Sequence, residues 1–360
     1  MKAPVLYEPN TPLVVEELDL DEPRQGEVKV KMMATGVCHS DWHVVKGDWP
    51  RIPLPSILGH ESAGVIEAVG PEVTSLATGD HVVLTWKPGC GRCEMCRQGW
   101  LSVCDLMPSV PSKPRVRGTG AEINQMIGLG GFGSYTVVPE TVAVRIDRDI
   151  PFAQAALVAC GVSTGVGAVF NTACVRPGTS VAVFGCGGVG LNCIQGSAIA
   201  GATTVIAVDL LDQKLDFARE FGATHTVNAS REDPVERIKE LTEGQGAHYA
   251  FEAVGLVEKP FVQSIECTRK RGVTVWIGAA PNDTPVTIDA MALFYEKTVM
   301  GSYLGSTRPH IDIPRFLSLY RAGKLKLDEL ITRSFALEEI NTAFEALSKG
   351  EVARGVIAFD

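Results

Sequence analysis

The sequence lacks the features that tie a protein to nucleic acid or to a membrane. Its 33 lysines and arginines are outnumbered by 42 aspartates and glutamates, whereas an anionic polymer or lipid surface attracts a concentrated basic patch. No uninterrupted apolar run approaches the roughly 18 residues that span a bilayer, and residues 1–23 show no apolar core followed by small residues, as a secretory signal would. We therefore expect a cytoplasmic protein without nucleic-acid or membrane partners.

The ten cysteines are not expected to form a disulfide framework, because disulfides seldom persist in a reducing compartment. Their spacing is interpreted first as metal or catalytic chemistry. The hydrophobic content of 45% and the 37 glycines are typical of a globular protein rich in turns. A chain of 360 residues exceeds what one hydrophobic core usually serves, so we expect two domains.

Two patterns of secondary structure divide the chain. From residue 28 to about 150, short β-rich runs alternate with Gly, Pro and Asp, which predicts a small antiparallel barrel or sandwich. From residue 179 onward, strands alternate with helices, which predicts an α/β fold with a parallel sheet wound on both faces. Two amphipathic helices near 312–322 and 337–348 and a last strand belong to neither pattern and are assigned to the first domain. The expected domains are 1–161, completed by 303–360, and 162–302.

A glycine motif opens the second domain. Gly185, Gly187 and Gly190 form G-x-G-x-x-G between a predicted buried strand and a helix, and Asp209 ends the next strand 19 residues beyond Gly190. Such glycines permit a tight turn, close approach of a pyrophosphate and packing of helix on strand. Asp209 would bind both adenosine ribose hydroxyls and repel a 2′-phosphate, which favours NAD over NADP. A glycine turn without a ligand and a methyltransferase nucleoside site are the alternatives.

Four cysteines are crowded into one polar loop. Cys90, Cys93 and Cys96 recur at intervals of three, and Cys104 follows eight residues later. Thiolates packed this densely repel one another unless a cation neutralises them, and four sulfurs suit a tetrahedral zinc ion closed to water. An iron–sulfur cluster is the competing interpretation. A closed site has no open position for a substrate, so any catalytic metal must lie elsewhere.

Further candidate ligands are spread along the first domain. The octapeptide GVCHSDWH contains Cys38, the stretch LGHES contains His60 beside Glu61, and VACGVSTG contains Cys160. Catalytic zinc needs three protein ligands and a free fourth position. Taken singly, each residue could equally be a buried thiol or a hydrogen-bonded core histidine.

Together these motifs closely resemble those of the zinc-dependent medium-chain alcohol dehydrogenases, with the class III-like bacterial branch as the nearest subgroup. The shared stretches are GVCHSDWH, GHESAGVIEAVG, GDHVV, the four-cysteine loop, CGVSTG, the glycine motif and RGVIAF. The resemblance implies a GroES-like β-barrel catalytic domain, a Rossmann coenzyme domain, two zinc ions per subunit and NAD. It also implies a homo-oligomer, dimer or tetramer, whose segment between Cys104 and Tyr135 is shorter than in the best-known animal enzymes.

The resemblance assigns roles residue by residue. Cys38, His60 and Cys160 become the catalytic zinc ligands, with Glu61 close to the metal, and Asp41 orients the ligand histidine. Ser40 corresponds to the hydroxyl that contacts the substrate oxygen, and His43 to the far end of a proton relay. Coenzyme contacts fall on His39, Gly185, Gly187, Gly188, Val189, Gly190, Asp209, Lys214, Ile277 and Arg354. Trp49 and Trp86 line an apolar substrate pocket, with plain core packing as the alternative.

The expected reaction interconverts small-molecule primary alcohols and aldehydes, with aromatic, allylic or medium-chain substrates favoured. The main alternative is a dehydrogenase of a formaldehyde–thiol adduct, formed with glutathione or mycothiol. Lys113, Arg115 and Arg117 could meet such an anionic substrate, although a basic run is usually a solvated face. A non-catalytic nucleotide-binding member of the superfamily is a third interpretation, but such members lack the zinc ligands that are present here.

Overall fold

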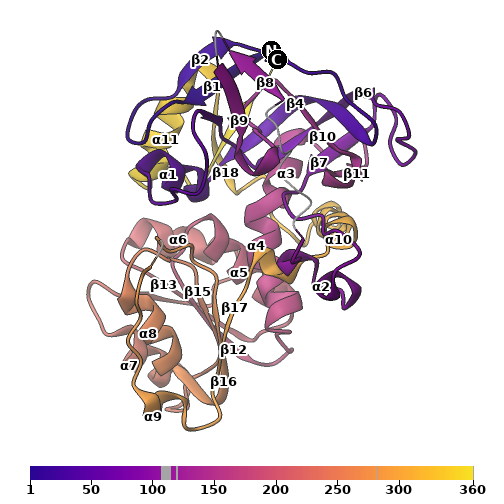
Figure 1. The fold of residues 1–360 in the computed structure, drawn as a ribbon. Helices are drawn as coiled ribbons and strands as arrows, with labels where there is room; N and C mark the ends of the chain where they lie inside the picture. The colour runs from indigo at the N-terminus through magenta and orange to yellow at the C-terminus, as the bar shows by residue number, and fades with distance from the viewer. Residues whose placement is uncertain (107–114, 119–120, 282, 360) are drawn as a thin grey trace. The chain divides into compact units, whose positions relative to one another are not determined.

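A computed structural model describes residues 1–106, 115–118, 121–281 and 283–359, which group into two compact units (Figure 1). The first unit comprises Met1–Gly161, Arg308–Tyr320 and Leu327–Asp360, and the second comprises Val162–Thr307 and Arg321–Lys326. Residues 303–307 and 321–326, which the sequence pattern placed in the first domain, thus lie with the second unit.

Local contacts explain where these two short segments lie. The carbonyl of Gly305 accepts a hydrogen bond from Asn171 Nδ2 at 3.3 Å. An added Cβ on Gly167 would lie only 2.6 Å from the Gly305 oxygen, so the two backbones touch. The backbone N–H of Lys326 donates to Gln195 Oε1 at 2.8 Å. These contacts lie within the second unit and hold both segments there.

Two sheets form the β part of the first unit. One has the described order β2-β1-β5-β9-β8-β3, and its strands are β1 (Lys2–Leu6), β2 (Val14–Glu17), β3 (Asp19–Leu20), β5 (Ser56–Ile57), β8 (Val116–Gly118) and β9 (Ala121–Gln125). The other has the order β11-β7-β6-β4-β19-β18, with β10 paired to β4. Its strands are β4 (Glu27–Val37), β6 (Glu61–Val69), β7 (His81–Leu84), β10 (Tyr135–Pro139), β11 (Ala143–Ile146), β18 (Ile331–Phe335) and β19 (Arg354–Ala358).

The long strand β4 organises the second of these sheets. Its residues alternate between buried and half-buried positions over most of its length, as a strand with one face on a core should. Strand β6 pairs along one edge, while β10 and then β19 share the other edge. Sharing one edge between two strands bends the sheet into a nearly closed barrel. The expected small antiparallel barrel is therefore confirmed.

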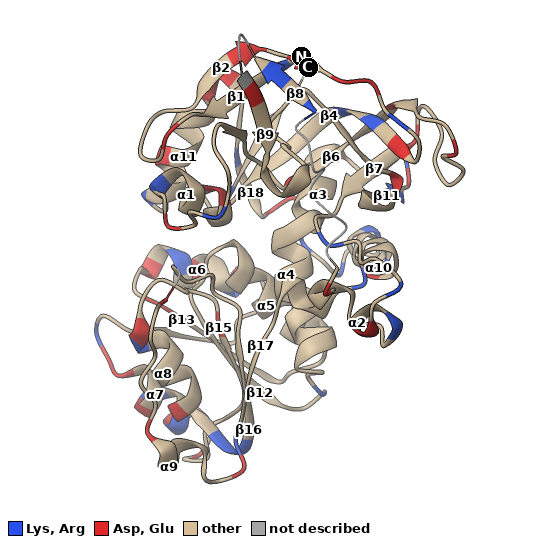
Figure 2. Ribbon diagram, in the orientation of Figure 1, with Lys and Arg blue, Asp and Glu red and all other residues tan. Residues whose placement is uncertain are grey.

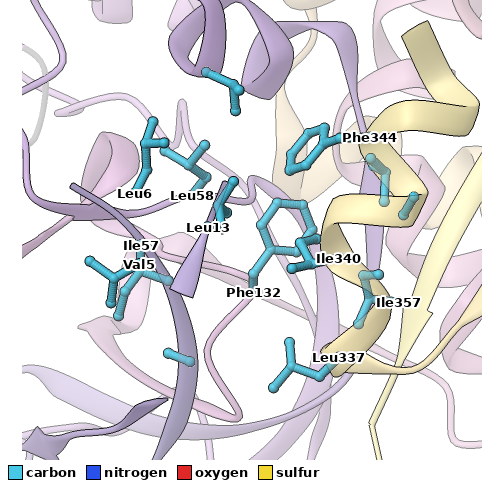
Figure 3. Close-up of a cluster of buried hydrophobic side chains, with 14 of the residues drawn as sticks. Val5, Leu6, Leu13, Ile57, Leu58, Phe132, Leu337, Ile340, Phe344 and Ile357 are labelled. Carbon is cyan, nitrogen blue, oxygen red and sulfur yellow. The ribbon is translucent and has the colours of Figure 1, made fainter. Parts of the chain in front are cut away.

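Helices from both ends of the chain complete the first unit. They are α1 (His39–Lys46), α2 (Glu94–Arg97), α3 (Phe152–Leu157), α10 (Pro309–Arg321) and α11 (Ile340–Ser348). Figure 3 shows Ile340 and Phe344 of α11 directed into the same apolar cluster as Val5 and Leu58. Phe132 and Phe344 meet edge to face, with ring centroids 5.9 Å apart. The C-terminal helix therefore shares a core with the N-terminal strands.

One long helical segment, Phe152–Thr172, lies between the β-rich part of the chain and the part in which strands alternate with helices. Helix α3 continues through a π-helical turn at 158–162 into α4 (Ser163–Gly167), and a second π-helical turn follows at 168–172. By length and composition alone the segment could cross a membrane, although no uninterrupted apolar run of that length occurs, because Gln154, Ser163 and Asn171 interrupt it. Of its most apolar window, 78% is buried within the protein, as in a helix that belongs to a core.

The second unit is built on a parallel sheet with the described order β14-β13-β12-β15-β16-β17. Its strands are β12 (Ser180–Phe184), β13 (Thr204–Asp209), β14 (His225–Asn228), β15 (Ala247–Glu252), β16 (Thr268–Trp276) and β17 (Thr298–Gly301). Its helices include α5 (Gly188–Ile199), α6 (Asp212–Glu220), α7 (Pro234–Leu241), α8 (Glu258–Glu266) and α9 (Ala290–Leu293). All of β12 is buried, as both-face coverage by helices requires. The expected doubly wound sheet is confirmed.

Candidate metal centres and coenzyme site

The four-cysteine loop brings its sulfurs together. The Sγ atoms of Cys90 and Cys96 are 3.9 Å apart, and those of Cys93 and Cys104 are 3.8 Å apart. The backbone N–H of Cys93 donates to Cys90 Sγ, and that of Cys96 donates to Cys93 Sγ. The short helix α2 begins directly after Cys93, so its first turn supplies one of these donors. The other donor, the N–H of Cys93, belongs to the residue just before the helix.

These distances fit one tetrahedral metal ion. Four sulfurs each about 2.3 Å from a zinc ion lie about 3.8 Å from one another. The N–H donation from Cys96 lowers the pKa of Cys93 to about 6, whereas burial raises that of Cys104 to about 12. Four thiolates at these distances would repel one another, and a bound zinc ion would neutralise them.

A second set of donor atoms lies at the end of β4. One ligand atom from each of Cys38, His60, Glu61 and Cys160 lies within 4.8 Å of the others, and all four residues are buried. Cys38 follows β4 directly and precedes the first turn of α1, where its carbonyl accepts from the N–H of Asp41 at 3.1 Å. Cys160 lies in the π-helical turn 158–162. Such turns in α-helices frequently occur at functional sites.

Asp41 fixes the orientation of His60. Its Oδ1 accepts from His60 Nδ1 at 3.1 Å and from the backbone N–H of Gly59 at 2.9 Å. Because a carboxylate only accepts, Nδ1 carries the proton, which leaves the lone pair of Nε2 available for a metal. In the described part of the chain this buried Nε2 has no hydrogen-bond partner. The residues therefore fit a metal ion bound at Nε2.

The surroundings of His60 are rich in negative charge. Burial disfavours its imidazolium form, but the Asp41 carboxylate and the Cys38 sulfur outweigh burial and raise the pKa of His60 well above its usual value. The Cys38 thiol is deprotonated more easily because it accepts a hydrogen bond from Cys160, so its pKa falls well below normal, while that of Cys160 rises. A divalent cation in place of these protons would allow both sulfurs to ionise.

Glu61 is buried beside these ligands and pairs with Arg354. Its side chain is 0% exposed, and its Oε1 accepts from Arg354 Nη1 at 3.2 Å. Burial raises the pKa of Glu61 to about 8, although the Arg354 charge opposes that shift. Two glycines make room for the pair. A Cβ on Gly36 would lie 2.4 Å from Glu61 Oε2, and one on Gly161 would lie 1.8 Å from Arg354 Nη2.

Arg354 was expected to contact a coenzyme pyrophosphate. Within the first unit the structure instead gives it a carboxylate partner from β6, and it is only 4% exposed. Its predicted coenzyme contact stays a prediction. The sequence signal for the observed partner was absent, because Glu61 and Arg354 are 293 positions apart.

Helix α1 carries the predicted relay residues. His39 is exposed and Ser40 is half-buried, whereas His43 is buried. His43 Nδ1 lies 2.8 Å from Asp48 Oδ2, and its ring stacks on that of Trp49 with a centroid distance of 5.0 Å. Sequence reasoning missed Asp48, although an aspartate just after the helix-ending Gly47 was an available signal.

Both predicted pocket tryptophans pack against apolar clusters. Trp49 lies against the cluster shown in Figure 3, and Trp86 lies against a second cluster that includes Val82 and Leu84. The Trp86 ring also meets the His60 ring edge to face, with centroids 6.5 Å apart. Core packing, the alternative for these residues, thus accounts for part of their surroundings. Their role in a substrate pocket stays a prediction.

The basic run proposed to meet an anionic substrate is engaged in ion pairs. Arg115 is 2% exposed and pairs with Asp21 and Glu27, and Arg117 pairs with Asp21 at 3.0 Å. Lys113 lies outside the described residues. In Figure 2 both signs of charge are scattered over each unit. Arg115 is therefore structural, whereas Arg117 is 61% exposed and already pairs with a carboxylate, which weakens the support for an anionic thiol adduct.

The glycine motif follows β12 as predicted. Gly185 has φ +90°, and a Cβ on Gly190 would lie 1.7 Å from the Gly185 oxygen. Gly187 precedes the first turn of α5, and nothing in the described residues lies within 4 Å of where its Cβ would be. Gly190 is thus required by packing, whereas Gly187 leaves open space at a helix N-terminus, as a bound pyrophosphate requires. Gly188 and Val189 form the first turn of α5.

Asp209 lies at the carboxyl end of β13, next to this turn. Its Oδ2 accepts from the N–H of Cys186 at 2.8 Å, and its Oδ1 accepts from the N–H groups of Leu210 and Leu211. The carboxylate is therefore held in place beside the glycine turn. Lys214 is half-buried in the first half of α6. The predicted coenzyme residues of the second unit thus meet at one edge of the sheet.

The same edge contains an acidic residue that sequence reasoning missed. Glu252 ends β15 with 0% exposure, and its Oε1 accepts from the N–H groups of Val254 and Gly255. Burial raises its pKa against these hydrogen bonds. The carbonyl of Glu252 accepts from the N–H of Ile277 at 2.9 Å, which places Ile277 at the edge as well. An acid at the end of a buried strand, as at Asp209, was the available signal.

Comparisons with known proteins agree with this architecture. Residues 24–148 match the family model described as alcohol dehydrogenase GroES-like domain, and residues 188–321 match that of zinc-binding dehydrogenase. The chain is 41% identical to an NDMA-dependent alcohol dehydrogenase of Amycolatopsis methanolica, over 99% of this chain and 98% of the relative. It is 37% identical to an S-(hydroxymethyl)glutathione dehydrogenase of Paracoccus denitrificans, over 99% of each chain.

A solved structure shows the same similarity. Benzyl alcohol dehydrogenase from Acinetobacter calcoaceticus matches with a TM-score of 0.92 and 32% identity, over 100% of this chain and 99% of that one. The chain therefore belongs to the zinc-dependent medium-chain alcohol dehydrogenase family. It has the GroES-like and Rossmann domains expected from the sequence, and the methyltransferase interpretation is excluded.

The buried Glu61–Arg354 pair generates a prediction about stability. Above about pH 8, where Glu61 is ionised, replacing Arg354 with alanine should lower the free energy of unfolding by about 3 kcal/mol, because a buried carboxylate loses its cationic partner. Adding Glu61→Gln should recover part of this loss, because the amide carries no charge. Urea unfolding of the variants measures both effects. Arg333→Ala, which removes an exposed guanidinium from β18, is the control, and an equal loss there would contradict the prediction.

Proposed function

We propose that this protein is an NAD-dependent zinc alcohol dehydrogenase that interconverts primary alcohols and aldehydes. The observation that carries the proposal is the buried set of Cys38, His60 and Cys160, in which His60 Nε2 has no hydrogen-bond partner among the described residues. Family membership supports the reaction type. A non-catalytic nucleotide-binding role is disfavoured, because such a role needs no ligand set of this kind.

Each residue of the proposed zinc and coenzyme sites has a separate role. When bound, zinc supplies Lewis-acid polarisation of the alcohol oxygen, and NAD accepts the hydride. Cys38, His60 and Cys160 would hold the zinc, with Asp41 keeping His60 in the required tautomer. Arg354 balances the charge of Glu61 beside them. Gly187 and the first turn of α5 would receive the pyrophosphate, and Asp209 the adenosine ribose.

The proton released from the alcohol needs a route out of the site. Ser40 lies in the first turn of α1, and His43 lies one turn further along the same helix. Residues three apart on a helix share a face, so a hydroxyl at Ser40 and an imidazole at His43 can serve one path. A histidine at the end of that path can accept a proton as a general base.

Aromatic or medium-chain primary alcohols are the proposed substrates. A relative of similar structure is named for benzyl alcohol, and the rings of Trp49 and Trp86 lie against His43 and His60. A formaldehyde–thiol adduct is the second candidate, because another relative is named for S-(hydroxymethyl)glutathione. The ion pairs of Arg115 and Arg117 weigh against that candidate.

We also propose that the protein is a cytoplasmic homo-oligomer, either a dimer or a tetramer. Strand β17 ends the described sheet order and pairs with β16 alone among the described strands. Near it Met291, Phe294 and Tyr295 are 54%, 72% and 50% exposed, as in a surface that another subunit covers. Both thiol clusters need reduced cysteines, which favours a reducing compartment.

Zinc content tests the two proposed metal sites. The purified protein should contain two zinc ions per subunit, and Cys93→Ser should lose one of them together with thermal stability, because the remaining thiolates lack a complete tetrahedron. Elemental analysis and thermal unfolding measure both. Cys174→Ser, at an exposed cysteine outside the clusters, should change neither. Iron, or one metal ion per subunit in the unmodified protein, would overturn the assignment.

Coenzyme choice tests the role of Asp209. We expect at least tenfold higher kcat/KM with NAD than with NADP, a preference that needs only about 1.4 kcal/mol. Asp209→Gly should reduce this preference, because the carboxylate no longer repels the 2′-phosphate. Asp216→Ala, at an exposed aspartate of α6, should keep it. Similar kcat/KM values for the two coenzymes in the unmodified enzyme would show that Asp209 does not bind the ribose.

A panel of alcohols tests the substrate class. Benzylic, allylic and medium-chain primary alcohols should exceed ethanol in kcat/KM by about tenfold, because each buried methylene adds roughly 0.8 kcal/mol. Secondary alcohols should be poor, and Trp86→Ala should weaken aromatic substrates more than ethanol. NADH absorbance reports the rates, with parallel assays containing NDMA because one relative is named as dependent on it. Ethanol equal to benzyl alcohol, or a strict need for added thiol, would favour the adduct reaction.

A further inference from the structure

The end of α1 has a defined backbone geometry. Gly47 follows the helix with φ +79°. Its N–H donates to the Val44 carbonyl at 3.0 Å, and the next N–H, of Asp48, donates to the His43 carbonyl at 2.9 Å. This pair of bonds is the Schellman motif, in which the chain folds back over the last helical turn. The turn thus brings the backbone of Asp48 next to that of His43, five positions earlier.

The side chains of that turn repeat the backbone pairing. Asp48 Oδ2 lies 2.8 Å from His43 Nδ1, so His43 and Asp48 are joined through both backbone and side chain. Trp49 stacks on the His43 ring with an angle of 18° between the ring planes. The imidazole is 4% exposed, whereas 37% of the Asp48 side chain is exposed. The ring is thus held on one edge by a carboxylate and on one face by an indole.

A carboxylate at Nδ1 decides which ring nitrogen is basic. A carboxylate is an acceptor only, so Nδ1 must donate and carry the proton in the neutral imidazole. The lone pair then lies on Nε2, at the opposite edge of the ring from Asp48. The same logic applies to Asp41 and His60, where the carboxylate leaves Nε2 available to a metal.

We propose that Asp48 is a positioning residue that holds His43 in the Nδ1–H tautomer, so that Nε2 receives the proton released from the alcohol. This inference depends on the proposed dehydrogenase function for its catalytic meaning. It adds to the relay a residue outside the octapeptide GVCHSDWH. The sequence VVKGDW, residues 44–49, then has two roles. It ends helix α1 at Gly47, and it supplies Asp48 and Trp49 as supports of His43.

Nitrogen NMR tests the tautomer without any turnover. In protein labelled with ¹⁵N-histidine, the His43 signals should show a protonated Nδ1 and an unprotonated Nε2 at a pH where the ring is neutral. The chain has seven histidines, so the loss of signals in His43→Gln assigns them. Asp48→Ala should reduce the Nδ1–H population, and Asp48→Asn, which preserves size, is the second variant. A protonated Nε2 in the unmodified protein, or no change in Asp48→Ala and Asp48→Asn, would overturn the inference.

A double-mutant cycle tests whether Asp48 acts through His43. Asp48→Ala should slow single-turnover hydride transfer about tenfold, a fraction of what a general base contributes, and should change KM for the alcohol much less. In a His43→Gln background the same change should have less than about a twofold effect. Asp19→Ala, at an exposed aspartate elsewhere in the first unit, is the control. An equal slowing by Asp48→Ala in both backgrounds would show that Asp48 does not act through His43.

The two measurements separate failure of the inference from failure of the proposed function. If the unmodified protein oxidises no alcohol with NAD, the proposed function is wrong, and the NMR result still decides where the His43 proton lies. If it oxidises alcohols but the tautomer or the cycle disagrees, the proposed function stands and the role of Asp48 is wrong.

Discussion

The first unit depends on how it accommodates negative charge that is buried away from water. Cys38, Asp41, Glu61 and Cys160 are each at most 7% exposed. One donor atom from each of Cys38, Glu61 and Cys160 lies within 4.8 Å of a ring nitrogen of His60, and Asp41 binds the same histidine at Nδ1. Arg354 offsets the charge of Glu61. Without a metal ion, the charge of the remaining groups is reduced only by protons on the two thiols and on His60. Uncompensated buried charge costs several kcal/mol, so a divalent cation suits the site better than protons do.

In both units, predicted site residues lie at the ends of strands. Cys38 follows β4 directly, and the glycine turn and Asp209 stand at the carboxyl ends of β12 and β13. At such points the backbone leaves its ladder and its next groups become available to a ligand. Glycines then decide how closely other groups approach, because a side chain at Gly36 or Gly161 would occupy the space of the Glu61–Arg354 pair.

Helix α1 concentrates several roles in eight residues. It begins at His39, directly after the proposed ligand Cys38. Its Asp41 binds His60, and the turn at its end supports His43. Each carboxylate occupies one nitrogen of an imidazole and so leaves the other for a different partner. In the proposed function, the same arrangement would prepare one histidine for a metal and the other for a proton.

Local sequence determined the elements whose signals lie close together along the chain. The spacing of Cys90, Cys93, Cys96 and Cys104, the glycine motif and the strand–helix alternation each depend on near neighbours or on a regular period, so all could be predicted. Tertiary structure alone decided that Glu61 pairs with Arg354 and that Arg115 is buried among acids. Such pairs join residues far apart in sequence. Two charged side chains pair when the fold buries them in the same place, and the spacing of residues along the chain does not show which ones it buries together.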